Sequence, residues 1–232
     1  MEIFRFVFIL ILMSTNLLSN QSFAQDSPSK ISIALHYTPS FSFVNYRNDG
    51  GLETWLYEEI IDDDVQKFVN PASLNLYYRL NSKIEIQAGV GYQQMGHRTK
   101  LYESHLTNDF LKLTQFFVSH HFISVPLRVN YIYKSFFFGI GTDLNFHLSS
   151  QEKQISTFID GESVTETELN NVGIFNPFIC ATVGYKIKMG QKVFMSFAPN
   201  VGIAPSYMFK KDVSINRRYW QAGLQVGLEY RF

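Results

Sequence analysis

The feature that most constrains this chain is an alternation of apolar and polar residues with a period of two. In WQAGLQVGLEYRF, residues 220–232, each even-numbered residue is apolar and each odd-numbered one is polar or glycine. Successive side chains of a β-strand point to opposite faces, so this pattern predicts a strand with one apolar face. The chain is predicted to be all-β, with eight strands, because seven further segments alternate in the same way: 31–43, 73–80, 84–93, 123–133, 136–148, 177–187 and 193–203.

The connections between these strands alternate in length. Turns of about two to five residues, normal for hairpins, follow the second, fourth and sixth strands. The other connections are long and polar. In an antiparallel meander they all fall at one end, and short turns opposite long loops are typical of an outer-membrane barrel. The predicted long loops are 46–70, 98–119, 150–172 and 206–216.

The polar faces decide between two kinds of barrel. A soluble, lipocalin-like barrel would turn its apolar face inward, whereas a membrane barrel inverts this. The polar faces combine many glycines with charges of both signs at mid-strand. A crowded small-barrel lumen favours glycine and can pair arginine with carboxylates, whereas glycine weakens a solvent-facing strand. Tyrosine and phenylalanine near the ends of the apolar faces resemble the aromatic girdles of membrane barrels.

We therefore predict an eight-stranded antiparallel up-and-down transmembrane β-barrel in the outer membrane. An eight-stranded lumen is only just wide enough for its own side chains, so a salt-bridged plug is favoured over a channel. The predicted lumen charge network comprises Arg79, Glu85, Arg128, Asp143, Lys186, Glu229 and Arg231.

The first residues have the features of an export signal. Arg5 precedes an apolar run, residues 6–13, and Ser22-Phe23-Ala24 forms a small-x-small cleavage site. The run is too short to span a bilayer as a helix. We expect a signal peptide at residues 1–24 and a barrel domain at residues 25–232.

Composition excludes several functions. Lys plus Arg equals Asp plus Glu at 20 each, which argues against a nucleic-acid partner. A single cysteine, Cys180, forms neither an internal disulfide nor a four-ligand zinc site. The acidic segment Glu58–Asp64 could attract calcium, but it lacks the EF-hand spacing and glycine, which favours a solvated loop. No metal or cofactor is expected.

One segment has residues that a lipid hydrolase or acyltransferase could use. SHHFIS contains His120, His121 and Ser124. Adjacent residues of a strand point to opposite faces, so the two histidines cannot serve one site. The chain has neither a GxSxG nor an HExxH motif. We therefore expect a protein that is not an enzyme and has no catalytic residues.

Three neighbouring segments resemble a known family. A strand with QAGVGY, a strand with ISVPLRVNY and, after a short turn, FFFGIGTDLNF are similar to the PorT-like small outer-membrane barrel domain of Bacteroidetes-type bacteria. The resemblance covers residues 29–232 and implies a barrel in the outer membrane. The family includes a protein associated with type IX protein secretion. The resemblance also implies a terminal β-signal, which the barrel-assembly machinery reads, at Leu224, Val226, Leu228, Tyr230 and Phe232.

The expected function follows from this fold. We expect a non-enzymatic barrel that supports an envelope assembly, such as protein secretion or surface attachment, through its extracellular loops. Its expected partners are outer-membrane lipid, the barrel-assembly machinery and other envelope proteins. Two alternatives stay open: an outer-membrane lipid-modifying enzyme, and a small-molecule binder or narrow pore.

Overall fold

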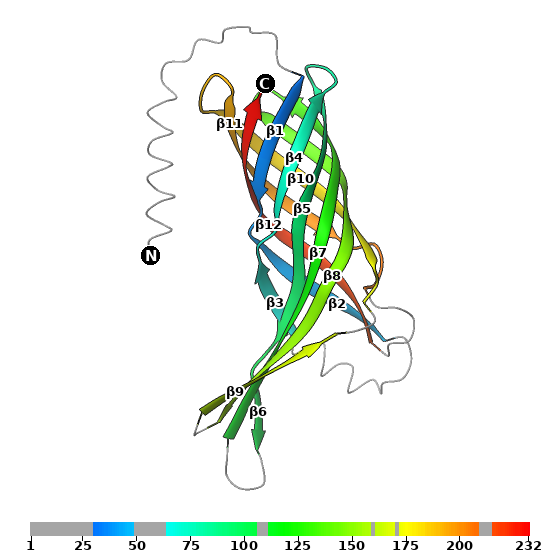
Figure 1. The fold of residues 1–232 in the computed structure, drawn as a ribbon, viewed down its shortest axis with the longest axis vertical. Coiled ribbons are helices and arrows are strands. Elements are labelled where there is room, and N and C mark those ends of the chain that lie inside the picture. The colour runs from blue at the N-terminus through cyan, green and yellow to red at the C-terminus, as the bar shows by residue number, and fades with distance from the viewer. Residues whose placement is uncertain (1–29, 49–63, 106–110, 159–160, 170–171, 209–214) are drawn as a thin grey trace.

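The structure is a closed barrel of antiparallel strands (Figure 1). This computed structural model describes residues 30–48, 64–105, 111–158, 161–169, 172–208 and 215–232. Each strand of the ring pairs with the next, and the last pairs with the first, which confirms the predicted eight-stranded up-and-down barrel. The ring consists, in order, of β1 (Ile31–Tyr37), β4 (Ala72–Arg79), β5 (Ile84–Thr99), β7 (Leu111–Tyr133), β8 (Phe136–Phe158), β10 (Phe175–Lys188), β11 (Val193–Ile203) and β12 (Ile215–Arg231).

Two of the ring strands are kinked at prolines. Strand β2 (Ser40–Asn48) continues β1 beyond Pro39, and β3 (Asp64–Val69) leads into β4 through Pro71. Proline has no backbone N–H to donate to a ladder, which weakens strand pairing at Pro39 and Pro71. Pro126, Pro177 and Pro199, by contrast, lie within the continuous strands β7, β10 and β11. Against β12 the register continues across the kink at Pro39, because β12 pairs first with β1 and then, in step, with β2. Against β5 the register shifts by only one residue between β4 and β3. Each kinked pair therefore acts as one strand of the eight.

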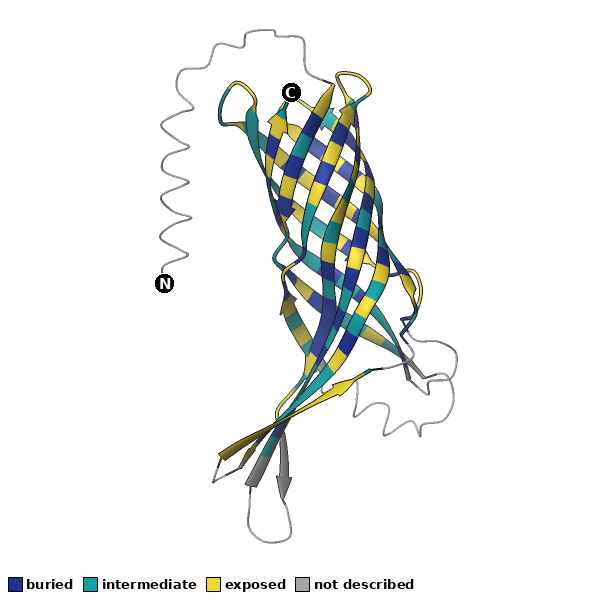
Figure 2. Cartoon of the chain, viewed as in Figure 1, coloured by how far each residue is buried: buried dark blue, intermediate teal, exposed yellow. Residues whose placement is uncertain are grey.

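The barrel exposes its apolar residues and buries its polar ones. In β7, Val129 is 51% exposed and points outward, whereas the next residue, Asn130, is 3% exposed in the lumen. Buried and exposed positions alternate along all the strands of the barrel wall (Figure 2). A closed ring satisfies every backbone group internally and can therefore place an apolar exterior in lipid. The predicted transmembrane arrangement is confirmed.

No helix among the described residues is long and apolar enough to cross a membrane. The predicted signal peptide, residues 1–24, and all of the acidic segment Glu58–Asp64 except Asp64 lie outside the described residues. The end of the barrel with the short turns is called the turn end below, and the opposite end the loop end.

Two of the predicted loops are wrong over much of their length. Strands β7 and β8 have 23 residues each, and β6 (Tyr102–His105) and β9 (Gly161–Glu168) extend them on either side. A bilayer needs only about 9–11 residues of a strand, so these four strands form a projecting sheet beyond it (Figure 1). Period-two hydrophobicity missed them because neither face meets lipid: every residue of β9 is exposed. The ends of the loop 46–70 are also strand, in β2 and β3.

Glycine is required where strands crowd the lumen. A Cβ at Gly141, on β8, would collide with the Leu127 carbonyl oxygen and come within 2.6 Å of Arg128 Cα, both on β7. A Cβ at Gly190, in a short turn, would meet nothing within 4 Å.

We therefore expect Gly141→Val to lower the free energy of unfolding by about 1–3 kcal/mol, the usual cost of overpacking. Gly190→Val is the matched control and should cost less than about 0.5 kcal/mol. Urea titration of the refolded barrel in detergent micelles, followed by tryptophan fluorescence, measures both. Equal losses in the two variants would contradict this account of the lumen.

Candidate functional site: the barrel lumen

Five of the seven predicted lumen charges meet near the turn end. Lys186 Nζ lies 3.0 Å from Glu85 Oε1 and 2.8 Å from Glu229 Oε2. Arg231 Nε lies 2.8 Å from Glu229 Oε1, and Arg79 Nη2 lies 3.6 Å from Glu85 Oε2. Both carboxylates are almost fully buried, at 1% and 3% exposure. We call these five residues, contributed by β4, β5, β10 and β12, the turn-end ion cluster.

Uncharged residues complete the surroundings of this cluster. Ser32 Oγ donates a hydrogen bond of 2.9 Å to Glu229 Oε1. The Lys186 ammonium lies 4.8 Å from the centre of the Tyr77 ring, and the Tyr77 hydroxyl is 3.0 Å from His36 Nε2. Sequence reasoning did not single out Ser32, Tyr77 or His36. Each of them lies next to lipid-facing residues in its strand, and this alternation could have shown that its side chain faces the lumen.

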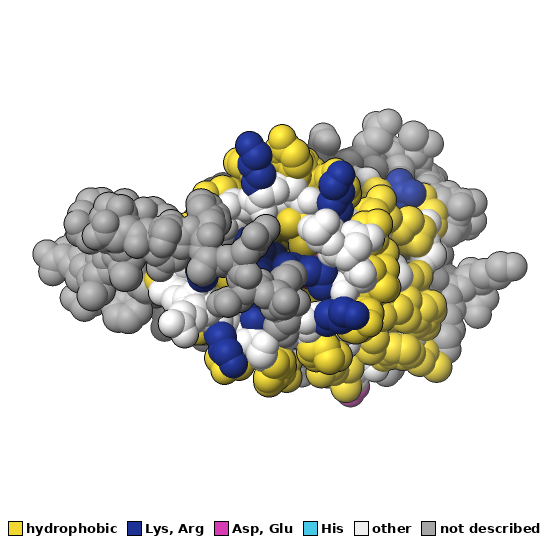
Figure 3. All heavy atoms as spheres, turned by 90° about the horizontal axis from the view of Figure 1, so that it is seen from above, with side chains coloured by type: hydrophobic (Ala, Val, Ile, Leu, Met, Phe, Trp, Pro, Cys, Tyr) yellow, Lys and Arg dark blue, Asp and Glu magenta, His cyan; other side chains and the backbone are white. Residues whose placement is uncertain are grey.

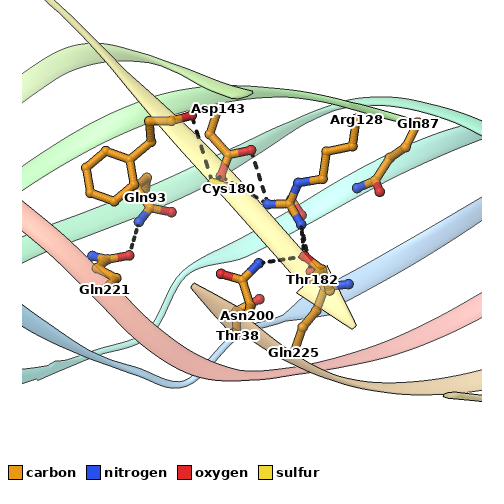
Figure 4. Close-up of polar contacts among 12 residues, drawn as sticks. Thr38, Gln87, Gln93, Arg128, Asp143, Cys180, Thr182, Asn200, Gln221 and Gln225 are labelled. Carbon is orange, nitrogen blue, oxygen red and sulfur yellow. Dashed lines mark hydrogen bonds and ion pairs between the residues drawn. The ribbon is translucent and has the colours of Figure 1, made fainter. Parts of the chain in front are cut away.

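The other two predicted charges form a separate pair deeper in the lumen. Arg128 Nη2 donates to both carboxylate oxygens of Asp143, at 3.1 and 3.0 Å. Arg128 Nη1 also donates to Gln225 Oε1 at 3.1 Å, and Cys180 Sγ lies 3.1 Å from Asp143 Oδ2. Figure 4 shows these side chains converging from different strands. The seven predicted residues therefore lie in two clusters.

The lumen around Arg128 is filled by side chains. The cavity beside Arg128, Asp143 and Cys180 has a volume of about 40 Å³. A water molecule needs at least about 10–15 Å³ of such space, so this cavity has room for a few waters and not for an organic ligand. The filled lumen favours a plug over a pore.

A third polar cluster lies at the loop end. The Tyr219 hydroxyl is 2.8 Å from His97 Nδ1 and 3.2 Å from His120 Nε2. His120 Nδ1 is in turn 2.7 Å from Ser150 Oγ, which also lies 2.7 Å from His147 Nε2. The chain of contacts joins β5, β7, β8 and β12 across the barrel.

The SHHFIS segment lies partly in this cluster. As predicted from strand geometry, His120 and His121 diverge: His120 is 0% exposed in the lumen, whereas His121 contacts the Tyr92 hydroxyl. The serine that His120 contacts is Ser150 and not Ser124. Ser150 is only 1% exposed, so its hydroxyl is inaccessible to a lipid substrate. Among the residues that the structure describes, no group of three or more His, Cys, Asp or Glu side chains could hold a metal ion.

Four of the predicted assembly-signal residues lie on the outer face of β12, and the fifth, Phe232, directly follows the strand. Leu224, Leu228, Tyr230 and Phe232 are 44%, 52%, 43% and 62% exposed, and Val226 is half-buried. Strand β12 pairs with β1 and closes the ring. Their outward position suits contact with lipid, and their role as a signal stays a prediction.

Comparisons with known proteins reveal likeness only at the level of fold. No family model and no curated protein matches the chain. The chain is similar to the outer membrane protein OprG from Pseudomonas aeruginosa, at 9% identity and a TM-score of 0.43 over 90% of this chain and 100% of that one. The chain is also similar to Neisserial surface protein A, at 9% identity and a TM-score of 0.40 over 89% of this chain and 100% of that one. For the outer membrane protease OmpT from Escherichia coli, the identity is 8% and the TM-score is 0.41, over 92% of this chain and 99% of that one. These values assign the chain to no family.

The turn-end ion cluster leads to a stability prediction. Lys186→Met leaves Glu85 and Glu229 buried without their shared ammonium group, and breaking a buried ion pair in this way typically costs about 3–5 kcal/mol. The exposed pair Lys153–Glu166, with 3.6 Å between Nζ and Oε1, is the control. Lys153→Met should cost less than about 1 kcal/mol. Urea unfolding in micelles compares the two. A loss of less than about 1 kcal/mol in Lys186→Met would contradict an essential role for this ion pair.

The loop-end histidines lead to a pH prediction. Burial lowers the pKa of His97 and of His120 well below 6.5, and the nearby positive charges of Arg217 and Lys67 lower both pKa values further. Below about pH 6.5 the unfolded chain therefore binds protons that the folded barrel does not, so stability falls on acidification. We expect the free energy of unfolding to decrease between pH 7.5 and pH 5.

The variant His97→Gln/His120→Gln should show a smaller decrease over the same range, by up to about 1.4 kcal/mol per histidine for each pH unit below 6.5. Urea titrations at matched ionic strength measure both slopes. Identical slopes in the double variant and the original protein would show that other groups control the response.

Proposed function

We propose that this protein is a non-enzymatic outer-membrane barrel that supports an envelope assembly, such as protein secretion or surface attachment, from its loop end. The projecting sheet carries this proposal. Strands β7 and β8 each have 23 residues, and a bilayer needs about 9–11 of them, which leaves about 12–14 residues of each strand beyond the bilayer. At about 3.4 Å per residue, these segments run on for roughly 40 Å along the strands beyond the membrane surface. That reach suits contact with other envelope proteins.

The apolar exterior supports the membrane part of the proposal. Exposed aliphatic and aromatic side chains surround the barrel. Among them are Leu35, Val90, Ile140 and Leu228, which are 52–66% exposed. A soluble monomer rarely exposes such a contiguous surface. Outer-membrane lipid is thus the proposed surrounding, and the barrel-assembly machinery is the proposed partner during insertion. The finer proposal, membership of the PorT-like family, is supported by the segments QAGVGY, ISVPLRVNY and FFFGIGTDLNF.

Two observations argue against the alternatives. The cavity beside Arg128, of about 40 Å³, is too small for an organic ligand, which disfavours a small-molecule site or a pore through the middle of the lumen. The Ser150 hydroxyl, between two histidines, is buried, which disfavours a lipid-modifying enzyme. The exposed projecting sheet is then the part of the described chain best placed to act on another molecule.

Shortening the projecting sheet tests the proposal. Removing residues 154–165 and joining the cross-strand pair Lys153 and Glu166 through Asn-Gly should preserve a hairpin. The barrel should still insert, because the removed residues lie outside the membrane ring. Envelope proteins that co-purify with the intact protein in mild detergent should be lost or reduced at least tenfold, as measured by quantitative mass spectrometry.

Two controls make this result interpretable. Heat-modifiable gel mobility reports whether the shortened barrel has folded. Exchanging the charges of the pair, in Lys153→Glu/Glu166→Lys, keeps the sheet and should keep the partners. Recovery of the same partners with the shortened, folded barrel would overturn the proposed role of the sheet.

A further inference from the structure

The turn end of the barrel has a hollow lined by cations. A cavity of about 600 Å³ lies between Arg79, Lys134, Lys186, Lys188 and Arg231. These five side chains define the basic basin. Seen from the turn end, lysine and arginine side chains lie around this end of the barrel and at its centre (Figure 3). They come from β4, β10, β12 and the turn between β7 and β8, so closure of the barrel brings them together.

The basic basin has an excess of positive charge. Five cations face two carboxylates, Glu85 and Glu229, which leaves a net charge of +3. The carboxylates are buried beneath the basin and pair with Arg79, Lys186 and Arg231. Lys134 and Lys188 are exposed at the rim, and neither forms an ion pair with a described carboxylate. The rim is therefore available to an external anion.

The basin lies at the level expected for lipid headgroups. Phe136 lines it and is 49% exposed on the lipid-facing surface of β8. Lys134 Nζ lies 5.6 Å from the centre of the ring of Tyr133, another exposed side chain, and Lys192 Nζ lies 5.9 Å from that of Tyr230. Tyrosine and lysine side by side at strand ends are typical of the membrane–water interface. The basin thus adjoins both the barrel mouth and the surrounding leaflet.

We propose that the basic basin binds the phosphate of an anionic phospholipid in the leaflet at the turn end. Lys134 and Lys188 would contact the phosphate, while the acyl chains lie along the apolar face near Phe136. The lipid-facing position of Phe136 favours a membrane lipid over a soluble anion or an acidic protein segment. This proposal is independent of the projecting sheet, which lies at the opposite end.

Lipid titration of the purified barrel tests the site. Native mass spectrometry in detergent measures binding of dioleoylphosphatidylglycerol and, for comparison, dioleoylphosphatidylcholine, which has no net charge. We expect preference for phosphatidylglycerol. Lys134→Gln/Lys188→Gln should weaken its binding about 30-fold, since each basic side chain near an anionic bilayer contributes about 1 kcal/mol. Arg98→Gln/Lys100→Gln removes the same charge at the loop end and should leave binding unchanged.

Several results would overturn the proposal. These are equal affinity for the two lipids, retention of binding in Lys134→Gln/Lys188→Gln, or equal weakening in the loop-end control. Glycerol 3-phosphate provides a further arm: binding as tight as that of the whole lipid would identify a soluble phosphate ligand and refute the lipid. Failure of glycerol 3-phosphate to compete at a hundredfold excess would support it. Heat-modifiable mobility verifies that every variant is folded.

Discussion

Closure of the strand ladder is the constraint on which the rest of the structure depends. In hydrocarbon, an unpaired backbone N–H or carbonyl group has no water to bond, so the last strand must pair with the first. The pairing of β12 with β1 meets this requirement, and it continues into β2 beyond the kink at Pro39. Where Pro39 and Pro71 interrupt the wall, the Thr38 N–H still donates to the Pro71 carbonyl at 2.9 Å. Closure also divides every strand into a lipid face and a lumen face.

Closure makes the lumen a place where charges are buried and must neutralise one another. Lys186 lies between Glu85 and Glu229, so one ammonium group serves two carboxylates from different strands. The Arg128–Asp143 pair binds β7 to β8 in the same way. Such pairs gain little over a well-packed apolar core, but they are costly to break once formed. They therefore favour one arrangement of strands over neighbouring registers, in which these side chains would be left unpaired.

Much of this fold was predictable from sequence because lipid and lumen impose opposite demands on alternate residues. Val129 and Asn130 differ in polarity for that reason. The same alternation along each strand predicted that the seven charged residues face the lumen. The alternation gives the face on which a side chain lies, but not which lumen side chains are close to one another. It therefore did not separate the Arg128–Asp143 pair from the turn-end ion cluster. Nor did it reveal the contact between His120 and Ser150, which lie 30 residues apart. The projecting sheet was missed because it lies beyond the bilayer, and β9, which is exposed throughout, has no apolar alternation to detect.

The two ends of the barrel present different surfaces to other molecules. At the turn end, the strands stop in short turns, and the exposed cations cannot reach far from the membrane. A ligand there must come to the interface, which suits a lipid headgroup. At the loop end, the strands continue past the bilayer as hydrogen-bonded β7 and β8, so contact residues are held away from the surface on a paired sheet. The side chains that fill the lumen around Arg128 disfavour transport between the ends. This difference between the two ends favours a protein that binds lipid at the turn end and contacts partners at the loop end.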